Sequence, residues 1–240
     1  MHPQTEPDVI PTYKSEPRII WIGDREALYA LLDDLDNIPK FKTRLFITLE
    51  GKFIGHESRI SIMQIYNALS HRVYLIDVYW LGATTFWWAN RRMTFLKDVL
   101  ESEDIIKVFF DAKQYSEALY SQYKIRLAGV HDLQLMELTT GENPYQLSDI
   151  DGCFIRDAPR QPLFLWDLRG AVPSWCSHRI RARCVQIFPV LYACYDAKLR
   201  AQPGQRENMI AASKSIVELS QNMICASEEW HRALMRRDVD

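Results

Sequence analysis

The 240-residue chain has no long apolar run, no excess of one charge, no internal repeat and no low-complexity tract. Its most apolar stretch, residues 73–89, is interrupted by Asp77 and is too short to cross a bilayer, so no contact with a membrane is expected. Lys and Arg number 29 and Asp and Glu 31, so a nucleic-acid surface would need local clustering of basic side chains. With 48% hydrophobic and 25% charged residues, the chain is expected to form a globular core.

The cysteines and the N-terminal residues indicate in which cellular compartment the protein is expected. The five cysteines contain no Cys-x-x-Cys pair, which favours free thiols in a reducing compartment and argues against a zinc site. Residues 1–17 carry four prolines and several charges but no apolar segment, which is typical of a flexible leader rather than a signal peptide. We therefore expect an intracellular protein, and the sequence leaves nucleus or cytoplasm open.

Hydrophobic periodicity predicts alternating strands and helices. Strands are expected at residues 18–22, 44–49, 59–66, 72–78, 105–110 and 130–132. Helices are expected at residues 25–35, 94–100, 113–123, 133–138, 146–155, 179–199 and 207–235, with Asp24 capping the first. Short connections between the second, third and fourth strands suit an antiparallel meander, and the later strand–helix alternation favours parallel pairing. The predicted fold is α/β, with a mixed sheet of about five strands flanked by helices.

The last 40 residues, 201–240, are predicted to form an amphipathic helix that follows the main domain at residues 18–200. Four apolar residues stand seven apart and predict one apolar face, namely Met209, Ile216, Met223 and Trp230. This face either packs on the domain or contacts another subunit or protein. Ser213, Ser220 and Ser227 stand where a coiled coil would need apolar residues, which favours the packed helix.

Several segments, in their order and spacing, resemble the ribonuclease D-like 3′–5′ exonuclease domain of the DEDD superfamily. They are residues 45–51, 60–65, 73–78, 96–102 and 107–111, followed by 116–119, 132–138 and 188–192. The resemblance covers residues 19–199 and implies a ribonuclease H-like fold. Enzymes of this family hold two Mg²⁺ or Mn²⁺ ions with four carboxylates, because hard oxygen ligands are needed to stabilise the attacking and leaving oxygens.

Placed on the family's motifs, this sequence lacks most of those carboxylates. Thr48 and Glu50 stand at the two acidic positions of the first motif, and Tyr115 stands at the acidic position of the second. Cys184 replaces the third-motif carboxylate, and Ile180 replaces the Tyr or His that orients the attacking water. The resemblance therefore implies a pseudo-enzyme without catalytic residues or a metal cofactor. Glu50 is the residual candidate metal ligand, and Mg²⁺ or Mn²⁺ would be needed only if the chain were active.

Two neighbouring acids and one aromatic cluster allow other interpretations. Asp111 is interpreted as a helix N-cap and Glu117 as a solvated helix residue, with a relocated metal site as the alternative. Phe86, Trp87 and Trp88 are interpreted as a core or loop-anchoring group, with an exposed contact patch as the alternative.

The second half of the chain contains the best local candidate for a nucleic-acid surface. Its proposed contacts are basic side chains interleaved with aromatic residues: Arg156, Arg160, Arg169, Arg179, Arg181 and Arg183. We therefore predict an inactive exonuclease-like domain that binds single-stranded nucleic acid, RNA favoured, or scaffolds a ribonucleoprotein assembly. Two alternatives stay open. The chain could be a protein-interaction module without nucleic-acid affinity, self-associating or binding a partner through its C-terminal helix, or an active metal-dependent 3′–5′ exonuclease.

Overall fold

The structure, a computed structural model, describes residues 17–39, 44–52, 59–141, 153, 156 and 177–237, of which residues 52, 177–184 and 226–237 are described by their backbone alone. The strands are β1 (Arg18–Ile22), β2 (Arg44–Lys52), β3 (Arg59–Asn67), β4 (Arg72–Asp77), β5 (Ile106–Phe109) and β6 (Val130–Asp132). The helices are α1 (Arg25–Asp36), α2 (Val78–Leu81), α3 (Thr84–Trp87), α4 (Leu96–Glu101), α5 (Ala112–Tyr123), α6 (Leu133–Thr140), α8 (Ser177–Arg200) and α9 (Gln205–Arg237). Apart from Pro17 and Cys153, the residues of the predicted leader and of the predicted helix at 146–155 fall outside the described residues.

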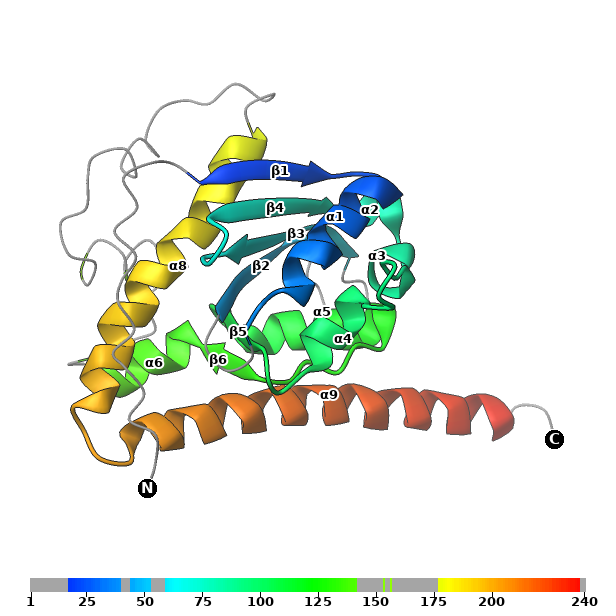
Figure 1. The fold of residues 1–240 in the computed structure, drawn as a ribbon. Coiled ribbons are helices and arrows are strands. Elements are labelled where there is room, and N and C mark those ends of the chain that lie inside the picture. The colour runs from blue at the N-terminus through cyan, green and yellow to red at the C-terminus, as the bar shows by residue number, and fades with distance from the viewer. Residues whose placement is uncertain are drawn as a thin grey trace.

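The strands form one mixed sheet in the order β1-β4-β3-β2-β5-β6 (Figure 1). The meander β2-β3-β4 is antiparallel, whereas β1 pairs with β4 and β5 pairs with both β2 and β6 in parallel. The α/β prediction is confirmed. Within the described residues all six predicted strand segments join one sheet, which is one strand more than the predicted total of about five. The predicted Asp24 cap is also confirmed, since its carboxylate accepts a hydrogen bond from the amide of Ala27 at 2.8 Å.

Helices cover both faces of the sheet and bury a separate apolar cluster on each. Odd-numbered β2 residues such as Ile47 pack with α1, α4 and α5, whereas Phe46 packs with α6, α8 and the start of α9. This alternation is the period-two pattern of a strand that is buried on both faces. Among the described residues, no helix is long and apolar enough to cross a membrane. Among the described residues, Cys153, Cys194 and Cys225 form no disulfide.

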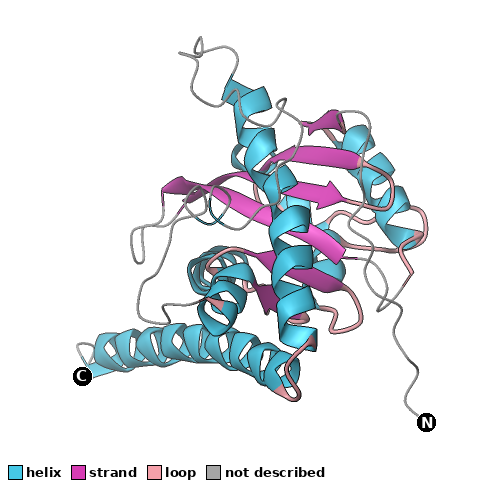
Figure 2. Ribbon diagram, turned by 90° about the vertical axis from the view of Figure 1, so that its left-hand side faces the viewer, coloured by secondary structure: helices cyan, strands magenta, loops and turns pink. Residues whose placement is uncertain are grey.

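Helix α9 packs along α5, α6 and the β6 edge of the sheet (Figures 1 and 2). The packed-helix prediction is therefore confirmed, but the seven-residue stripe does not stay on the buried face. Met209 is buried, Ile216 is half-buried and Met223 is 65% exposed. A straight α-helix drifts by about 20° per heptad, so a residue two heptads on has turned away from the interface. Ser213 lies on the buried face instead, and its hydroxyl accepts a hydrogen bond from the amide of Asp132 on the edge strand at 3.2 Å.

Asp132 caps two helices at once. Its carboxylate accepts hydrogen bonds from the amides of Asp111 (3.1 Å) and Ala112 (2.9 Å) at the start of α5, and from the amide of Gln134 (2.9 Å) in α6. Burial raises the pKa of Asp132, although these hydrogen bonds oppose the shift. Asp111 is the N-cap residue of α5, as predicted, but Asp132 rather than Asp111 accepts the hydrogen bonds at the start of this helix. Asp111 stands at the N-cap position with a left-handed backbone, φ 60°, and its side chain makes no capping hydrogen bond.

Candidate functional site

The first- and second-motif positions meet where β2 approaches the start of α5. Thr48 is buried on β2, and its hydroxyl oxygen lies 3.2 Å from that of Tyr115, which α5 supplies from 67 residues further along the chain. The Tyr115 ring also packs on Phe109 at the end of β5, with 5.8 Å between ring centroids. Two neutral hydroxyls therefore touch each other at the positions that the sequence predicts to correspond to two of the family's carboxylates.

Glu50, the remaining carboxylate of the first motif, bonds to a neighbour in the sheet. The Gln64 side-chain amide of β3 donates a hydrogen bond to Glu50 Oε1. Gln64 stands directly opposite Thr48 in the antiparallel ladder and is fully buried. Its own Oε1 has no hydrogen-bond partner among the described residues. The sequence interpretation missed Gln64, although one polar residue inside the apolar run 62–66 was a signal of a polar neighbour in the core.

A register shift follows Glu50 and gives Gly51 a defined role. The ladder between β2 and β3 is irregular between Glu50 and Gly51. A Cβ atom at position 51 would lie 1.9 Å from the carbonyl oxygen of Arg59, so only glycine fits this close backbone approach. The bulge therefore fixes the direction of the strand immediately after the residual carboxylate.

Helix α8 packs against β2 and β3 and carries both third-motif positions, Ile180 and Cys184, whose side chains lie outside the described part of the chain. The only carboxylate in the α8 sequence is Asp196, 12 residues after Cys184, which corresponds to roughly 18 Å along a helix. Asp196 accepts hydrogen bonds from Arg200 (2.6 Å) and Arg206 (2.7 Å). Burial alone would raise the pKa of Asp196, but the two arginines outweigh burial and lower it. Asp196 thus serves the α8–α9 junction.

The two acids considered for a relocated site are used elsewhere. Glu117 is partly exposed and forms a loose ion pair with Lys113, 3.9 Å away on the same helix. The Asp111 carboxylate accepts a hydrogen bond from the side chain of Gln114. Within the described ranges, no group of three or more His, Cys, Asp and Glu side chains could hold a metal ion.

Of the six arginines predicted to bind nucleic acid, only Arg156 has a described side chain. It is partly exposed and forms an ion pair with the buried Glu137 of α6 at 2.7 Å. Arg160 and Arg169 lie outside the described residues. Three more, Arg179, Arg181 and Arg183, lie in the first half of α8 and are described by their backbone alone.

The predicted aromatic cluster at residues 86–88 divides between core and surface. Phe86 is fully buried and packs on Tyr123 with 4.6 Å between centroids. Trp88 is half-buried, packs against the core and has the Arg25 guanidinium 5.2 Å from its ring centroid. Trp87, between them, is 51% exposed. Both interpretations therefore apply, each to different members of the cluster.

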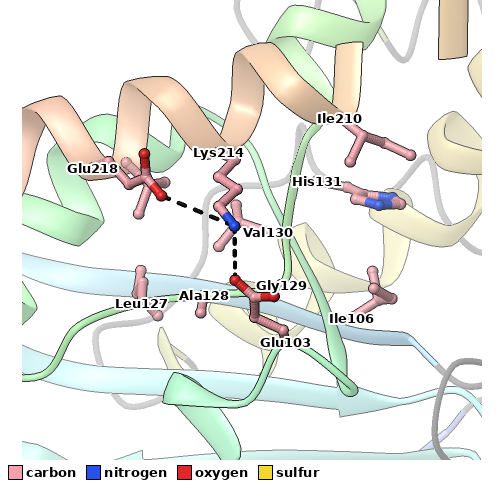
Figure 3. Close-up of a pocket in the computed structure, with 11 residues that line it drawn as sticks. Glu103, Ile106, Leu127, Ala128, Gly129, Val130, His131, Ile210, Lys214 and Glu218 are labelled. Carbon is pink, nitrogen blue, oxygen red and sulfur yellow. Dashed lines mark hydrogen bonds and ion pairs between the residues drawn. The ribbon is translucent and has the colours of Figure 1, made fainter. Parts of the chain in front are cut away.

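A cavity of about 300 Å³ lies apart from these positions, between β6 and α9 (Figure 3). Its walls are mainly apolar, with Ile106, Val130 and Ile210 among them. Lys214 of α9 crosses it and pairs with Glu103 at 2.8 Å and Glu218 at 4.0 Å (Figure 3). None of the predicted motif residues lines this cavity.

Comparison with known proteins shows which family part of the chain matches and which solved structures share its fold. The 3′–5′ exonuclease family matches residues 48–150, which begin at the first-motif position. Ribonuclease D of Trypanosoma brucei in complex with RNA U12 superposes with a TM-score of 0.62 at 18% identity, covering 86% of this chain and 71% of that one. Residues 48–150 therefore match the 3′–5′ exonuclease family, and the chain shares the fold of ribonuclease D. NrnC of Brucella melitensis with bound Mg²⁺ shares the fold at a TM-score of 0.60 and 15% identity, covering 87% of this chain and 93% of that one.

Two curated relatives of this exonuclease-like domain carry the name piRNA biogenesis protein EXD1. The mouse protein is 28% identical over 159 residues, which cover 60% of this chain, and the human protein is 28% identical over 127 residues, which cover 50%. The matched regions span only 26% of the mouse protein and 23% of the human protein. The chain therefore matches about a quarter of each relative's length.

With the motif placement predicted from the sequence, the residues at these positions do not fit the two-metal centre of ribonuclease D-like enzymes. Two divalent ions bring a formal charge of +4, and Glu50 is the only carboxylate that the three motifs supply. Threonine and tyrosine are neutral at pH 7, and a cysteine sulfur is a soft ligand that is poorly suited to Mg²⁺. The hydroxyl of Thr48 is moreover already in contact with that of Tyr115.

Proposed function

We propose that this exonuclease-like domain is catalytically inactive and binds single-stranded RNA, alone or as part of a ribonucleoprotein assembly. One observation carries the loss of catalysis: Thr48 and Tyr115 hydrogen-bond to each other, and Glu50 accepts a hydrogen bond from Gln64, at the positions that would hold the metals. Without metal ions, the domain has neither a means of generating the attacking nucleophile nor a counter-charge for the leaving oxygen.

Two findings and one physical argument support RNA as the ligand. A ribonuclease of this fold has been solved in complex with RNA, and the EXD1 relatives are named for piRNA biogenesis. Binding also survives the loss of catalysis in principle, because phosphate contacts need basic side chains and amides, and base stacking needs aromatic faces. The six arginines predicted from the sequence remain the proposed phosphate contacts, and the Arg156 side chain is 49% exposed while paired with Glu137.

Equilibrium binding across a salt series tests this function. We expect fluorescently labelled single-stranded RNA to bind the full chain with an affinity that falls linearly on a log–log plot against salt, with a slope of about 0.7 per neutralised phosphate. Single-stranded DNA of the same sequence tests the preference for RNA. If the chain did not bind RNA at about 50 mM salt, the proposed RNA-binding function would be wrong.

A second candidate function is protein interaction through the outer face of α9. Leu219 and Met223 are one helical turn apart and are 61% and 65% exposed. Such a pair is typical of a helix that contacts another helix. Sedimentation velocity of the wild type against the Leu219→Glu/Met223→Glu double variant tests self-association. A concentration-dependent dimer that the double variant loses would favour this candidate.

A further inference from the structure

Two very short helices expose large aromatic side chains. In α2, Val78 and Leu81 are buried, whereas Tyr79 and Trp80 are 74% and 76% exposed. In α3, the exposed aromatic residue is Trp87. Neither the Tyr79 hydroxyl nor the Trp80 indole N–H makes a hydrogen bond within the described residues. We call Tyr79, Trp80 and Trp87 the aromatic surface.

The aromatic surface is next to the degenerate site because of the sheet register. Glu50 pairs with Ile62 on β3, and Ile62 pairs with Asp77 on β4, so the three residues form one row across the sheet. Two strand spacings separate Glu50 from Asp77, which is roughly 10 Å. Asp77 is also the N-cap of α2, since its carboxylate accepts a hydrogen bond from the amide of Trp80 at 2.9 Å. A strand that passes over Glu50 along this row therefore reaches the aromatic surface.

Basic side chains flank the aromatic surface. Residues 78–98 contain three basic side chains and one acidic one, in a chain whose overall charge is −2. Lys97 holds its ammonium group 5.5 Å from the centroid of the Trp87 ring and also pairs with Glu101, so its charge is already partly neutralised. Arg91 and Arg92 are exposed, and neither forms an ion pair within the described part of the chain. Phosphate groups would be the natural counter-charge for this pair.

The turn that carries the two arginines is held in a fixed shape. Asn90 is buried, and its side-chain oxygen accepts hydrogen bonds from the amides of Arg92 (3.0 Å) and Thr94 (2.9 Å). Its amide nitrogen donates to Asp33 at 2.9 Å and to Asp36 at 2.6 Å, both on α1. The arginines therefore project from a preorganised turn, which lowers the entropy lost when they bind a ligand.

We propose, building on the RNA-binding function above, that the aromatic surface stacks the bases of a single-stranded RNA that passes over Glu50, while Arg91 and Arg92 contact its phosphates. Stacking on an aromatic ring is tolerant of sequence, because every base has a π face. A protein partner could also use exposed tryptophans, but the unpaired arginines and the continuity with the Glu50 row favour a polyanionic strand.

Fluorescence anisotropy of the full chain with a labelled single-stranded oligouridine RNA tests this surface. Trp80→Ala should raise the Kd by about 5- to 100-fold, since an aromatic–base stack lost to alanine has that effect. Trp80→Phe should recover most of the affinity because it keeps an aromatic face. The matched control is Leu69→Ala, which removes an exposed apolar side chain in the β3–β4 turn, at the other end of β4 from α2. Its Kd should equal that of the wild type.

A salt series separates the two kinds of contact. Arg91→Gln/Arg92→Gln should flatten the log–log salt slope by about 1.4, at about 0.7 per lost phosphate contact, whereas Trp80→Ala should leave the slope unchanged. If the wild type binds RNA and neither Trp80→Ala nor Trp87→Ala changes its Kd by more than twofold, the proposal is overturned and the surface is assigned to a protein partner. The proposed RNA-binding function would still stand. A wild type without RNA affinity would overturn both.

Discussion

The hydroxyl pair in the degenerate site gives a quantitative prediction. Removing the two hydroxyls by Thr48→Val and Tyr115→Phe, singly and together, forms a double-mutant cycle on their hydrogen bond. The oxygens are 3.2 Å apart, which is long for a bond between hydroxyls, so the bond belongs in the weaker half of the net range of about 0.5–1.5 kcal/mol. We expect a coupling free energy of about 0.5–1 kcal/mol. Each single variant should lose about 1 kcal/mol of unfolding free energy, and the double variant less than their sum.

Urea denaturation followed by tryptophan fluorescence measures the four unfolding free energies. Tyr123→Phe is the matched control, because Tyr123 lies on the same helix and its hydroxyl makes no hydrogen bond within the described ranges. Combined with Thr48→Val, it should show no coupling. A Thr48–Tyr115 coupling below about 0.2 kcal/mol would refute the reasoning, because the two side chains would then not replace the missing metal ligands by binding each other.

Three further predictions follow from buried groups and from the motif placement. Burial lowers the pKa of Lys107 from 10.5 to about 7, so the unfolded state binds more protons than the folded state between these pH values. The free energy of unfolding should therefore rise with pH in this range, by up to about 1.4 kcal/mol per pH unit. Urea midpoints measured from pH 7 to 9 should lose this slope in Lys107→Met, and an unchanged slope would contradict the prediction. Asp132→Ala should lower the free energy of unfolding, measured by urea denaturation, by about 3 kcal/mol, because it leaves buried amides without an acceptor. A loss below about 1 kcal/mol would argue against the capping of two helices by Asp132. Thr48→Asp/Tyr115→Asp/Cys184→Asp should gain a thermal shift with Mn²⁺, equivalent to about 2.7 kcal/mol at 100 times the Kd, and no shift would count against the motif placement.

The sequence predicted the sheet well because each strand is a short apolar or β-branched run that ends at a polar turn. All six predicted strand segments are strands, and even the three-residue β6 was recognised from its place before a helix. The helices α2 and α3 were missed because four residues are too few to show a helical period. The exposure of Tyr79 and Trp80 was not predicted either, because both residues lie in the most apolar stretch of the chain, which shows no helical period.

Contacts between distant segments explain the other differences. The motif alignment named Thr48 and Tyr115 independently, and the fold brings their hydroxyls together. Gln64 belongs to no motif, and its contact with Glu50 follows only from the register of β2 and β3. The α5 cap comes from Asp132, about 20 residues beyond the helix start, so local capping rules assigned it to the nearer acid, Asp111.

An exonuclease assay with end-labelled single-stranded RNA tests the central claim most directly. The full chain, its Glu50→Gln variant and an active ribonuclease D would be incubated with Mg²⁺ or Mn²⁺, each with and without a chelator. The account predicts that only the active control shortens the RNA, while this chain binds it intact. If the wild type shortened the RNA, and both the chelator and Glu50→Gln abolished the shortening, the account would be contradicted. Glu50 would then be part of a working metal centre.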